Sequence, residues 1–177
     1  MSEPRVRPAE DCDLAAIQCI YADAVRSTAS SFELEPPTID EMRERRTRLV
    51  EAGYPYFVAE LDGRLAGYCY AGPFRDRPAY RATIEDSVYV DRRFQRGGIG
   101  RILLERLIGA CASLGFRQMI AVIGGNDNAA SVRLHRRAGF ERVGVLRDVG
   151  WKFECWQPVC IMQRSLGVDG GDSIRRD

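Results

Sequence analysis

The chain has 177 residues, of which 45% are hydrophobic and 29% are charged, and its formal net charge is +1. A chain of this length folds as one domain and buries roughly two-thirds of its unfolded surface. The balanced charge creates no overall field for nucleic acid or an acidic membrane, so we expect neither as a partner. Because the sequence has no membrane-length apolar run and no charged-then-apolar leader, we expect a cytoplasmic protein.

The cysteines do not follow a metal-binding or disulfide pattern. They are Cys12, Cys19, Cys69, Cys111, Cys155 and Cys160. None forms a C-x-x-C pair, and the single histidine cannot complete the usual zinc-finger spacings. We therefore expect free cysteines that pack as small hydrophobic residues, and no metal.

The N-terminal part of the chain predicts one short strand and two helices. The strand ends at Val6, and Asp11 and Asp13 mark the start of the first helix. A loop follows over residues 27 to 37, and Thr38 to Glu41 has the spacing of a capping box, which opens the second helix. The arginines of this helix alternate with glutamates, which favours a solvated face over a nucleic-acid contact.

The middle of the chain alternates strands and helices. Asp62-Gly63 is a strong signal for a two-residue hairpin turn between the first two strands. The expected elements are strands over residues 56 to 61, 65 to 72 and 81 to 90, a helix over 99 to 114, a strand over 118 to 123, and a helix over 128 to 138. Gly139 is placed to end this last helix in a left-handed conformation.

The C-terminal part predicts two strands within residues 140 to 166, around a loop that contains Trp151, Lys152, Phe153 and Trp156. Residues 167 to 177 lack apolar periodicity and predict a disordered tail. We expect an α+β fold, with a mixed central sheet of about seven strands and about four flanking helices. Residues 1 to 166 would form its single domain.

A glycine-bearing turn lies between the strand that ends near residue 90 and the helix that begins at residue 99. Its sequence is Gln95-Arg96-Gly97-Gly98-Ile99-Gly100. A dinucleotide-binding fingerprint needs a further glycine where Leu103 stands, and a P-loop needs Gly-Lys followed by Ser or Thr. The turn therefore has two remaining interpretations. It is an ordinary loop, or its backbone amides bind a phosphate at the helix N-terminus.

A second pattern contains the only histidine. Asn128, Ser131 and His135 are spaced by three and four residues, so they lie on one stripe of a helix. Two interpretations stay open from spacing alone. Asn128 caps the helix while His135 is structural, or the stripe faces a ligand.

Both patterns resemble the GNAT superfamily of N-acetyltransferases. Gln95, Gly98 and Gly100 match its Gln/Arg-x-x-Gly-x-Gly/Ala motif. The helix expected over residues 128 to 138, together with the two residues after it, matches the family at Asn128, Ser131, Gly139 and Phe140. The resemblance implies the GNAT fold, in which a bulged strand splays from its neighbour and opens a slot for acetyl-CoA.

Several features are similar to one branch, the phosphinothricin N-acetyltransferase-like enzymes. Leu134-His135 stands where the superfamily usually has a tyrosine, and the branch has Leu-His. Residues 28 to 38, 79 to 90 and 150 to 156 also resemble this branch. The resemblance then covers the chain up to about residue 166. It implies a homodimer, with the Trp151 to Trp156 segment at the subunit contact.

The resemblance assigns roles to individual residues. Residues expected to bind acetyl-CoA are Val88, Tyr89, Val90, Gln95, Arg96, Gly97, Gly98, Ile99, Gly100, Arg101, Asn128 and Ser131. Glu85 would act as the base that removes a proton from the acceptor amine, and the N–H of Val90 would stabilise the oxyanion. His135 would protonate the CoA thiolate or hold a water chain. Side-chain chemistry, and not the resemblance, gives the residues expected to contact the acceptor: Arg75 and Arg81, which precede the strand with Glu85, for a carboxylate, and Phe32 and Tyr80 for an apolar wall.

The expected reaction moves acetyl from acetyl-CoA to the α-amino group of a small analogue such as phosphinothricin, methionine sulfoximine or methionine sulfone. Two alternatives stay open: a GNAT enzyme that acts on protein N-termini or another amine, and a non-catalytic acyl-CoA-binding module.

Overall fold

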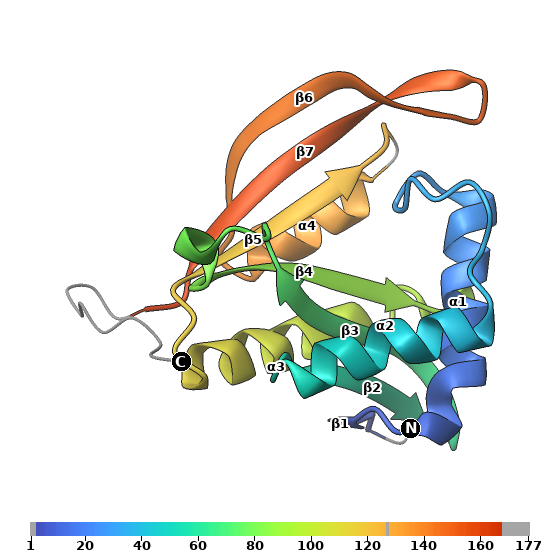
Figure 1. Cartoon of the computed structure of the whole chain (residues 1–177). Helices are drawn as coiled ribbons and strands as arrows, with labels where there is room; N and C mark the ends of the chain where they lie inside the picture. Colours follow the sequence, from blue (N-terminus) through green and yellow to red (C-terminus); the bar gives the residue numbers. More distant parts are fainter. Residues whose placement is uncertain (1–2, 127, 168–177) are drawn as a thin grey trace.

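The computed structural model describes residues 3–126 and 128–167 of the chain. Its elements follow the order β1 (Arg5–Pro8), α1 (Leu14–Ser27), α2 (Ile39–Glu51), β2 (Tyr56–Leu61), β3 (Arg64–Pro73), β4 (Thr83–Val90), α3 (Ile99–Ser113), β5 (Gln118–Gly124), α4 (Ala129–Arg137), β6 (Glu141–Lys152) and β7 (Cys155–Ser165). The strands form one sheet in the order β1-β2-β3-β4-β5-β7-β6 (Figure 1). The predicted mixed sheet of seven strands with four helices is confirmed.

Two apolar layers enclose the central part of this sheet. One core lies under α1 and α2, and it includes stacked tyrosines such as Tyr56 and Tyr68, whose ring centroids are 5.9 Å apart. The other core lies between the sheet, α3 and α4. Helix α3 contributes a face that repeats at helical spacing: Ile99, Leu103, Leu104, Leu107, Ile108 and Cys111. Each fully buried leucine stabilises this packing by about 2 kcal/mol, which holds the preceding glycine turn in place.

Three local sequence signals form the predicted structures. The Thr38 hydroxyl accepts the N–H of Glu41 at 3.2 Å, and the Glu41 carboxylate accepts the N–H of Thr38 at 2.6 Å. Asp62 and Gly63 have φ values of 51° and 71°, as a two-residue hairpin turn requires. Gly139 ends α4 with a φ of 83°.

Strands β4 and β5 are the only parallel neighbours among the described strands, and they separate along their length. They pair from Thr83–Gln118 to Asp86–Ala121 and no further, although β4 continues to Val90. The expected bulge of β4 is wrong, because its register with β3 runs unshifted from Gly67–Val90 to Pro73–Ile84. The second half of β4 stays on β3 while β5 diverges, so a split opens between β4 and β5.

The C-terminal hairpin also differs from the expectation of a loop around residues 151 to 156. Trp151 belongs to β6 and Trp156 to β7, and these two residues pair with each other. The turn consists of Phe153 and Glu154, which have left-handed φ values of 54° and 56°. Because the turn lacks the Gly or Asn that usually favours this conformation, no residue pattern predicts a tight hairpin here.

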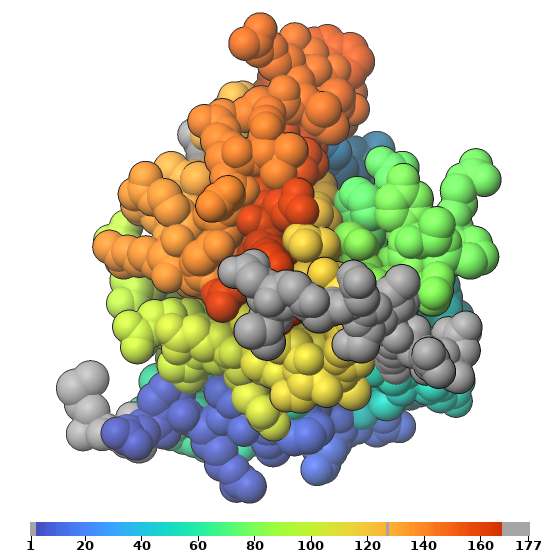
Figure 2. Space-filling model, turned by 90° about the vertical axis from the view of Figure 1, so that its left-hand side faces the viewer, coloured from blue at the N-terminus to red at the C-terminus, as the bar shows by residue number. Residues whose placement is uncertain are grey.

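The β6–β7 hairpin extends beyond the rest of the sheet and projects from the body of the protein (Figures 1 and 2). Its outer part exposes a series of large apolar side chains: Val143, Val145, Leu146, Val149, Trp151, Phe153 and Trp156. The predicted disordered tail falls, apart from Gly167, outside the described residues.

Candidate active site at the split between β4 and β5

The split exposes backbone groups of β4 that face no other strand. The N–H of Asp91 bonds to Ala66 of β3 at 3.0 Å. Because successive residues of a strand direct their N–H and C=O groups to opposite edges, those of Val88 and Val90 face the split. Those of Tyr89 face β3. Val88 and the N–H of Val90 therefore face a ligand in the split, whereas the carbonyl oxygen of Val90 accepts the side-chain amide of Gln95 at 3.4 Å. Tyr89 also lines the pocket.

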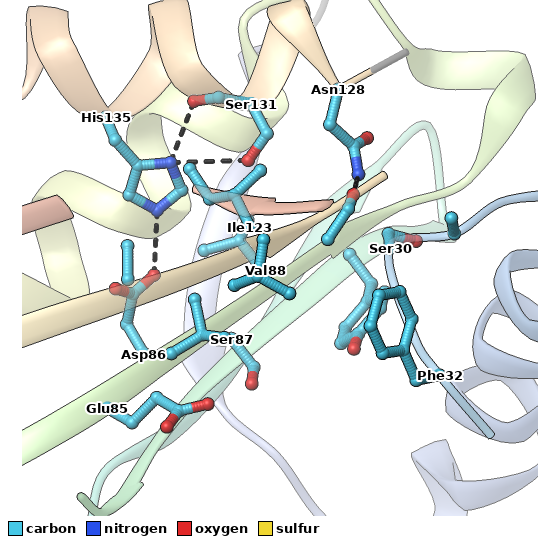
Figure 3. Close-up of a pocket in the computed structure, with 16 residues that line it drawn as sticks. Ser30, Phe32, Glu85, Asp86, Ser87, Val88, Ile123, Asn128, Ser131 and His135 are labelled. Carbon is cyan, nitrogen blue, oxygen red and sulfur yellow. Dashed lines mark hydrogen bonds and ion pairs between the residues drawn. The ribbon is translucent and has the colours of Figure 1, made fainter. Parts of the chain in front are cut away.

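A pocket of about 240 Å³ lies at the inner end of this split (Figure 3). Its wall combines residues of β4 and β5 with residues of α4 and of the loop between α1 and α2. The side chains labelled in Figure 3 are Ser30, Phe32, Glu85, Asp86, Ser87, Val88, Ile123, Asn128, Ser131 and His135. The sequence prediction had placed six of these ten in the site.

Glu85 lies in the pocket wall and is half-buried. Burial, with a smaller contribution from the neighbouring Asp86 and against the opposing charge of Arg75, raises the pKa of its carboxyl group to about 7. Desolvation disfavours the charged form, which explains the direction. A carboxylate with this pKa exchanges protons near neutral pH, so it is suited to act as a general base.

His135 and Asp86 form a buried pair on the other side of the pocket, and their side chains are 5% and 2% exposed. His135 Nε2 lies 2.9 Å from Asp86 Oδ2. Its Nδ1 lies 2.8 Å from the carbonyl oxygen of Ser131 and 3.3 Å from the Ser131 hydroxyl. Burial alone would lower the pKa of His135, but the bonds and charge of Asp86 and the Ser131 contact outweigh it and raise the pKa.

Asn128 is the N-cap residue of α4, as one of the two sequence interpretations held. Its side-chain amide donates to the carbonyl oxygen of Gly124 at the end of β5. The side chain makes no capping hydrogen bond to α4, and the residue lines the pocket. The bond to Gly124 fixes the start of α4 against β5 and thereby sets the position of Ser131 one turn later.

A groove continues from this pocket along β4 to the glycine turn. Its middle part is lined by Ser30, Val88 and Ser131, which it shares with the inner pocket, and by Val90 and Gln95. Its outer part, of about 510 Å³, surrounds the turn over residues 95 to 101. The inner pocket, the middle part and the outer part share wall residues and are therefore continuous.

The glycine turn directs backbone donors into the outer part of the groove. Gly98 has a φ of 84°, and its carbonyl oxygen accepts the N–H groups of Arg101 and Ile102 at 3.0 and 3.2 Å. Within the described part of the chain, the N–H groups of residues 96 to 100 have no backbone acceptor. A Cβ on Gly100 would lie 3.3 Å from the Leu134 side chain, so a larger residue at this position would crowd α4.

Four arginines surround the same outer part: Arg96, Arg101, Arg133 and Arg137. Arg96 and Arg101 were predicted, whereas Arg133 and Arg137 of α4 were not. The spacing of four between the latter two would have placed them on one helix face. Free amides at a helix N-terminus, together with guanidinium groups, form a site for a phosphate-bearing ligand.

The predicted acceptor residues divide into two groups. Phe32 lies in the pocket wall, and its ring packs on glycines: a Cβ on Gly150 would lie 2.1 Å from the ring and one on Gly124 would lie 2.9 Å from it. Arg75, Tyr80 and Arg81 do not line this pocket.

Arg75, Tyr80 and Arg81 instead contact residues near them in the chain. The Arg75 guanidinium lies 5.2 Å from the centre of the Phe74 ring, and Tyr80 packs edge-on against the same ring. Arg81 donates to the carbonyl oxygen of Pro78 at 3.4 Å. Of the three, only Arg75 acts on a pocket residue, through its charge on Glu85.

The described residues contain neither a metal-binding cluster nor a membrane-spanning helix. No group of three His, Cys, Asp or Glu side chains is placed to hold a metal ion in residues 3–126 and 128–167. No helix in these ranges is long and apolar enough to cross a membrane.

The fold and site together are those of an acyl-CoA-dependent transferase, and comparisons with known proteins agree. Residues 20–140 match the model of the Acetyltransferase (GNAT) family. The chain belongs to this family and is an acetyltransferase.

Named relatives cover nearly the whole chain. It is 48% identical over 163 residues to phosphinothricin N-acetyltransferase of Alcaligenes faecalis, covering 92% of this chain and 83% of the relative. It is 39% identical to the L-methionine sulfoximine/L-methionine sulfone acetyltransferase of Pseudomonas paraeruginosa, covering 91% and 94%. A crystal structure of a phosphinothricin acetyltransferase from Sinorhizobium meliloti with acetyl-CoA superposes with a TM-score of 0.91, at 40% identity, covering 98% and 99%. The resemblance to this branch is confirmed.

Proposed function

We propose that the protein acetylates the free α-amino group of a small amino-acid analogue in the cytoplasm, with acetyl-CoA as acetyl donor. Phosphinothricin, methionine sulfoximine and methionine sulfone are the candidate acceptors, since the relatives are named for these compounds. The observation that carries the proposal is Glu85. Its carboxyl group has a pKa of about 7 and lies in the pocket at the inner end of the split.

The groove fits acetyl-CoA in shape and in chemistry. Free amides of residues 96 to 100, with Arg96, Arg101, Arg133 and Arg137 around them, suit the pyrophosphate. The exposed edge of β4 at Val88 and Val90 suits the amides of pantetheine. When bound, acetyl-CoA supplies an acetyl group activated as a thioester.

Glu85 receives a proton from the acceptor ammonium, directly or through one water, and so frees the amine lone pair to attack. The N–H of Val90, which faces the split, stabilises the negative charge that develops on the acetyl oxygen. Ser131, which lines both the pocket and the groove, donates its hydroxyl proton to the leaving sulfur. The Nδ1 atom of His135 lies 3.3 Å from the Ser131 hydroxyl oxygen.

The pocket size supports a small acceptor. A volume of about 240 Å³ suits an amino acid better than a peptide N-terminus. Phe32 forms its apolar wall. Arg75, Tyr80 and Arg81 lie outside this wall, so they would reach an acceptor carboxylate only by moving toward it. Arg75 is the strongest candidate of the three because its charge already acts on Glu85.

We also propose that residues 1 to 166 form one catalytic domain and that the protein is a homodimer. The exposed apolar side chains of the β6–β7 hairpin support the dimer, because monomeric proteins rarely leave such a patch in water. A second copy is the proposed occupant of this surface, in line with the implied contact at Trp151 to Trp156.

Thiol release from acetyl-CoA tests the acceptor class. The purified protein is assayed with phosphinothricin, methionine sulfoximine and methionine sulfone, with the N-acetylated form of each as a matched control, and with short peptides. Turnover with a free analogue and none with its acetylated form supports the proposal. Turnover restricted to peptides would replace it by acetylation of protein N-termini. Acetyl-CoA binding without turnover on any amine would leave a binding module.

A further inference from the structure

The hydrogen-bond partners of His135 define how many protons its ring carries. The carbonyl oxygen of Ser131, 2.8 Å from Nδ1, has no proton and only accepts, so Nδ1 must carry a hydrogen. Asp86 Oδ2 lies 2.9 Å from Nε2, and an ionised carboxylate also only accepts. An imidazole with a hydrogen on both nitrogens is the positively charged imidazolium.

The surroundings leave Asp86 as the counter-charge of this ring. Burial raises the pKa of the thiols of Cys69 in β3 and Cys111 in α3, and the negative charge of Asp86 acts in the same direction. Both thiols therefore stay neutral. Phe140 packs edge-on against the imidazole with ring centroids 5.0 Å apart. Burial raises the pKa of Glu85, the neighbour of Asp86 on β4, to about 7, so at pH 7.5 this carboxyl group is mostly ionised and adds a negative charge and no positive one.

Asp86 is also incompletely bonded in the described structure. Its Oδ2 contacts His135, while Oδ1 is buried without a hydrogen-bond partner among the described residues. A buried carboxylate that lacks full hydrogen bonding is costly unless a positive charge compensates it. A neutral histidine would not provide that charge.

We infer that Asp86 is a positioning residue that holds His135 as an imidazolium in the resting enzyme, and that this cation stores the proton that Ser131 delivers to the CoA thiolate. The inference deepens the proposed function and rests on it for the delivery step. It separates the two proton transfers of the reaction: Glu85 accepts one from the amine, and His135 gives one to the sulfur.

The protons and electrons balance in this scheme. The amine lone pair forms the new N–C bond, its ammonium proton having passed to Glu85, and the second nitrogen proton leaves to water. The C–S bond breaks and its electron pair stays on sulfur. Ser131 gives its hydroxyl proton to that sulfur and takes the Nδ1 proton of His135. The ring is then neutral, its Nε2–H still donates to the Asp86 carboxylate, and Nδ1 is reprotonated from solvent.

Nitrogen-15 NMR of the histidine ring tests the charge state directly. The chain contains one histidine, so protein made without a histidine tag gives the ring signals of a single residue. The inference predicts that both ring nitrogens carry hydrogens at pH 7.5, a full unit above the ordinary histidine pKa of about 6.5. One bare ring nitrogen at that pH would overturn it. The measurement needs neither acetyl-CoA nor an acceptor, so it stands even where the proposed substrates fail.

Variants of two aspartates locate the cause. In Asp86→Asn, the ring should lose its charge near or below its ordinary pKa, and kcat should fall about 100-fold, as for loss of a general acid. Asp91→Asn is the matched control. Asp91 follows the same strand but bonds Arg93, so the ring signals should be unchanged. An Asp86→Asn ring that stays doubly protonated at pH 7.5 would refute the role of Asp86, and the wild-type spectrum alone decides the charge state if the variant does not fold.

Discussion

The half-buried position of Glu85 in the pocket wall makes the free energy of unfolding depend on pH. Its carboxyl group has a pKa of 4.5 when exposed and about 7 in the folded protein, because burial disfavours its charged form. The unfolded chain therefore loses this proton at a lower pH than the folded one. The stabilisation linked to the proton is fully present below pH 4.5 and is lost as the pH rises through about 7.

The size of the effect follows from the shift. At 1.36 kcal/mol per pKa unit, the full shift corresponds to about 3 kcal/mol, and most of it, about 2.5 kcal/mol, is lost between pH 5 and pH 8. Solvent around the exposed part of the side chain reduces this value, so it is an upper figure. Glu85→Gln has the same shape without a charge, and its free energy of unfolding should not show this loss.

Urea unfolding followed by circular dichroism at pH 5 and pH 8 measures it. Both proteins are compared at the same concentration, because unfolding of a dimer depends on concentration. Relative to wild type, Glu85→Gln should gain about 1 to 2.5 kcal/mol more at pH 8 than at pH 5. Other titrating groups are common to both proteins and largely cancel. An equal difference at the two pH values would refute a raised pKa for Glu85.

Three further substitutions test other parts of the site. Gly150→Ala places a Cβ 2.1 Å from the Phe32 ring, so steady-state kinetics should give an acceptor KM about tenfold higher with an unchanged KM for acetyl-CoA. Replacing Arg133 and Arg137 together by serine should raise the KM for acetyl-CoA about tenfold, whereas acetyl-pantetheine, which lacks the pyrophosphate, should be unaffected. Trp151→Asp should convert the proposed homodimer into a monomer in analytical ultracentrifugation, because it introduces a charge into the apolar hairpin surface.

Each of these has a contradicting result. A parallel rise in both KM values for Gly150→Ala would indicate general misfolding instead of a displaced Phe32 ring. Equal losses with acetyl-CoA and acetyl-pantetheine would move Arg133 and Arg137 away from the pyrophosphate. An unchanged sedimentation coefficient for Trp151→Asp would mean that the subunit contact lies elsewhere or that the wild-type protein is itself a monomer.

Local signals in the sequence were sufficient for most of the fold. The capping box at Thr38, the Asp62-Gly63 turn and the glycine cap at Gly139 each act within a few residues, and each formed as predicted. The hairpin turn at Phe153 and Glu154 was missed because its left-handed residues are not those that usually adopt this conformation.

The site was less accessible from the sequence because its contacts are distant. Asp86 and His135 are 49 residues apart in the chain, and no spacing rule connects a strand residue with a helix residue at that separation. The same holds for Gly150 and Phe32, which meet only because the C-terminal hairpin passes the loop after α1. Proximity along the chain instead led to Arg75 and Arg81, which precede β4 but do not line the pocket.

Turnover by wild type and Glu85→Gln, measured side by side with phosphinothricin, tests the central claim most directly. CoA release gives the rate, and calorimetry gives the affinity for acetyl-CoA. We predict saturable turnover by wild type and a loss of about 100-fold or more in Glu85→Gln, with acetyl-CoA affinity equal within about twofold. Turnover by Glu85→Gln at the wild-type rate across pH 6 to 8 would contradict the account.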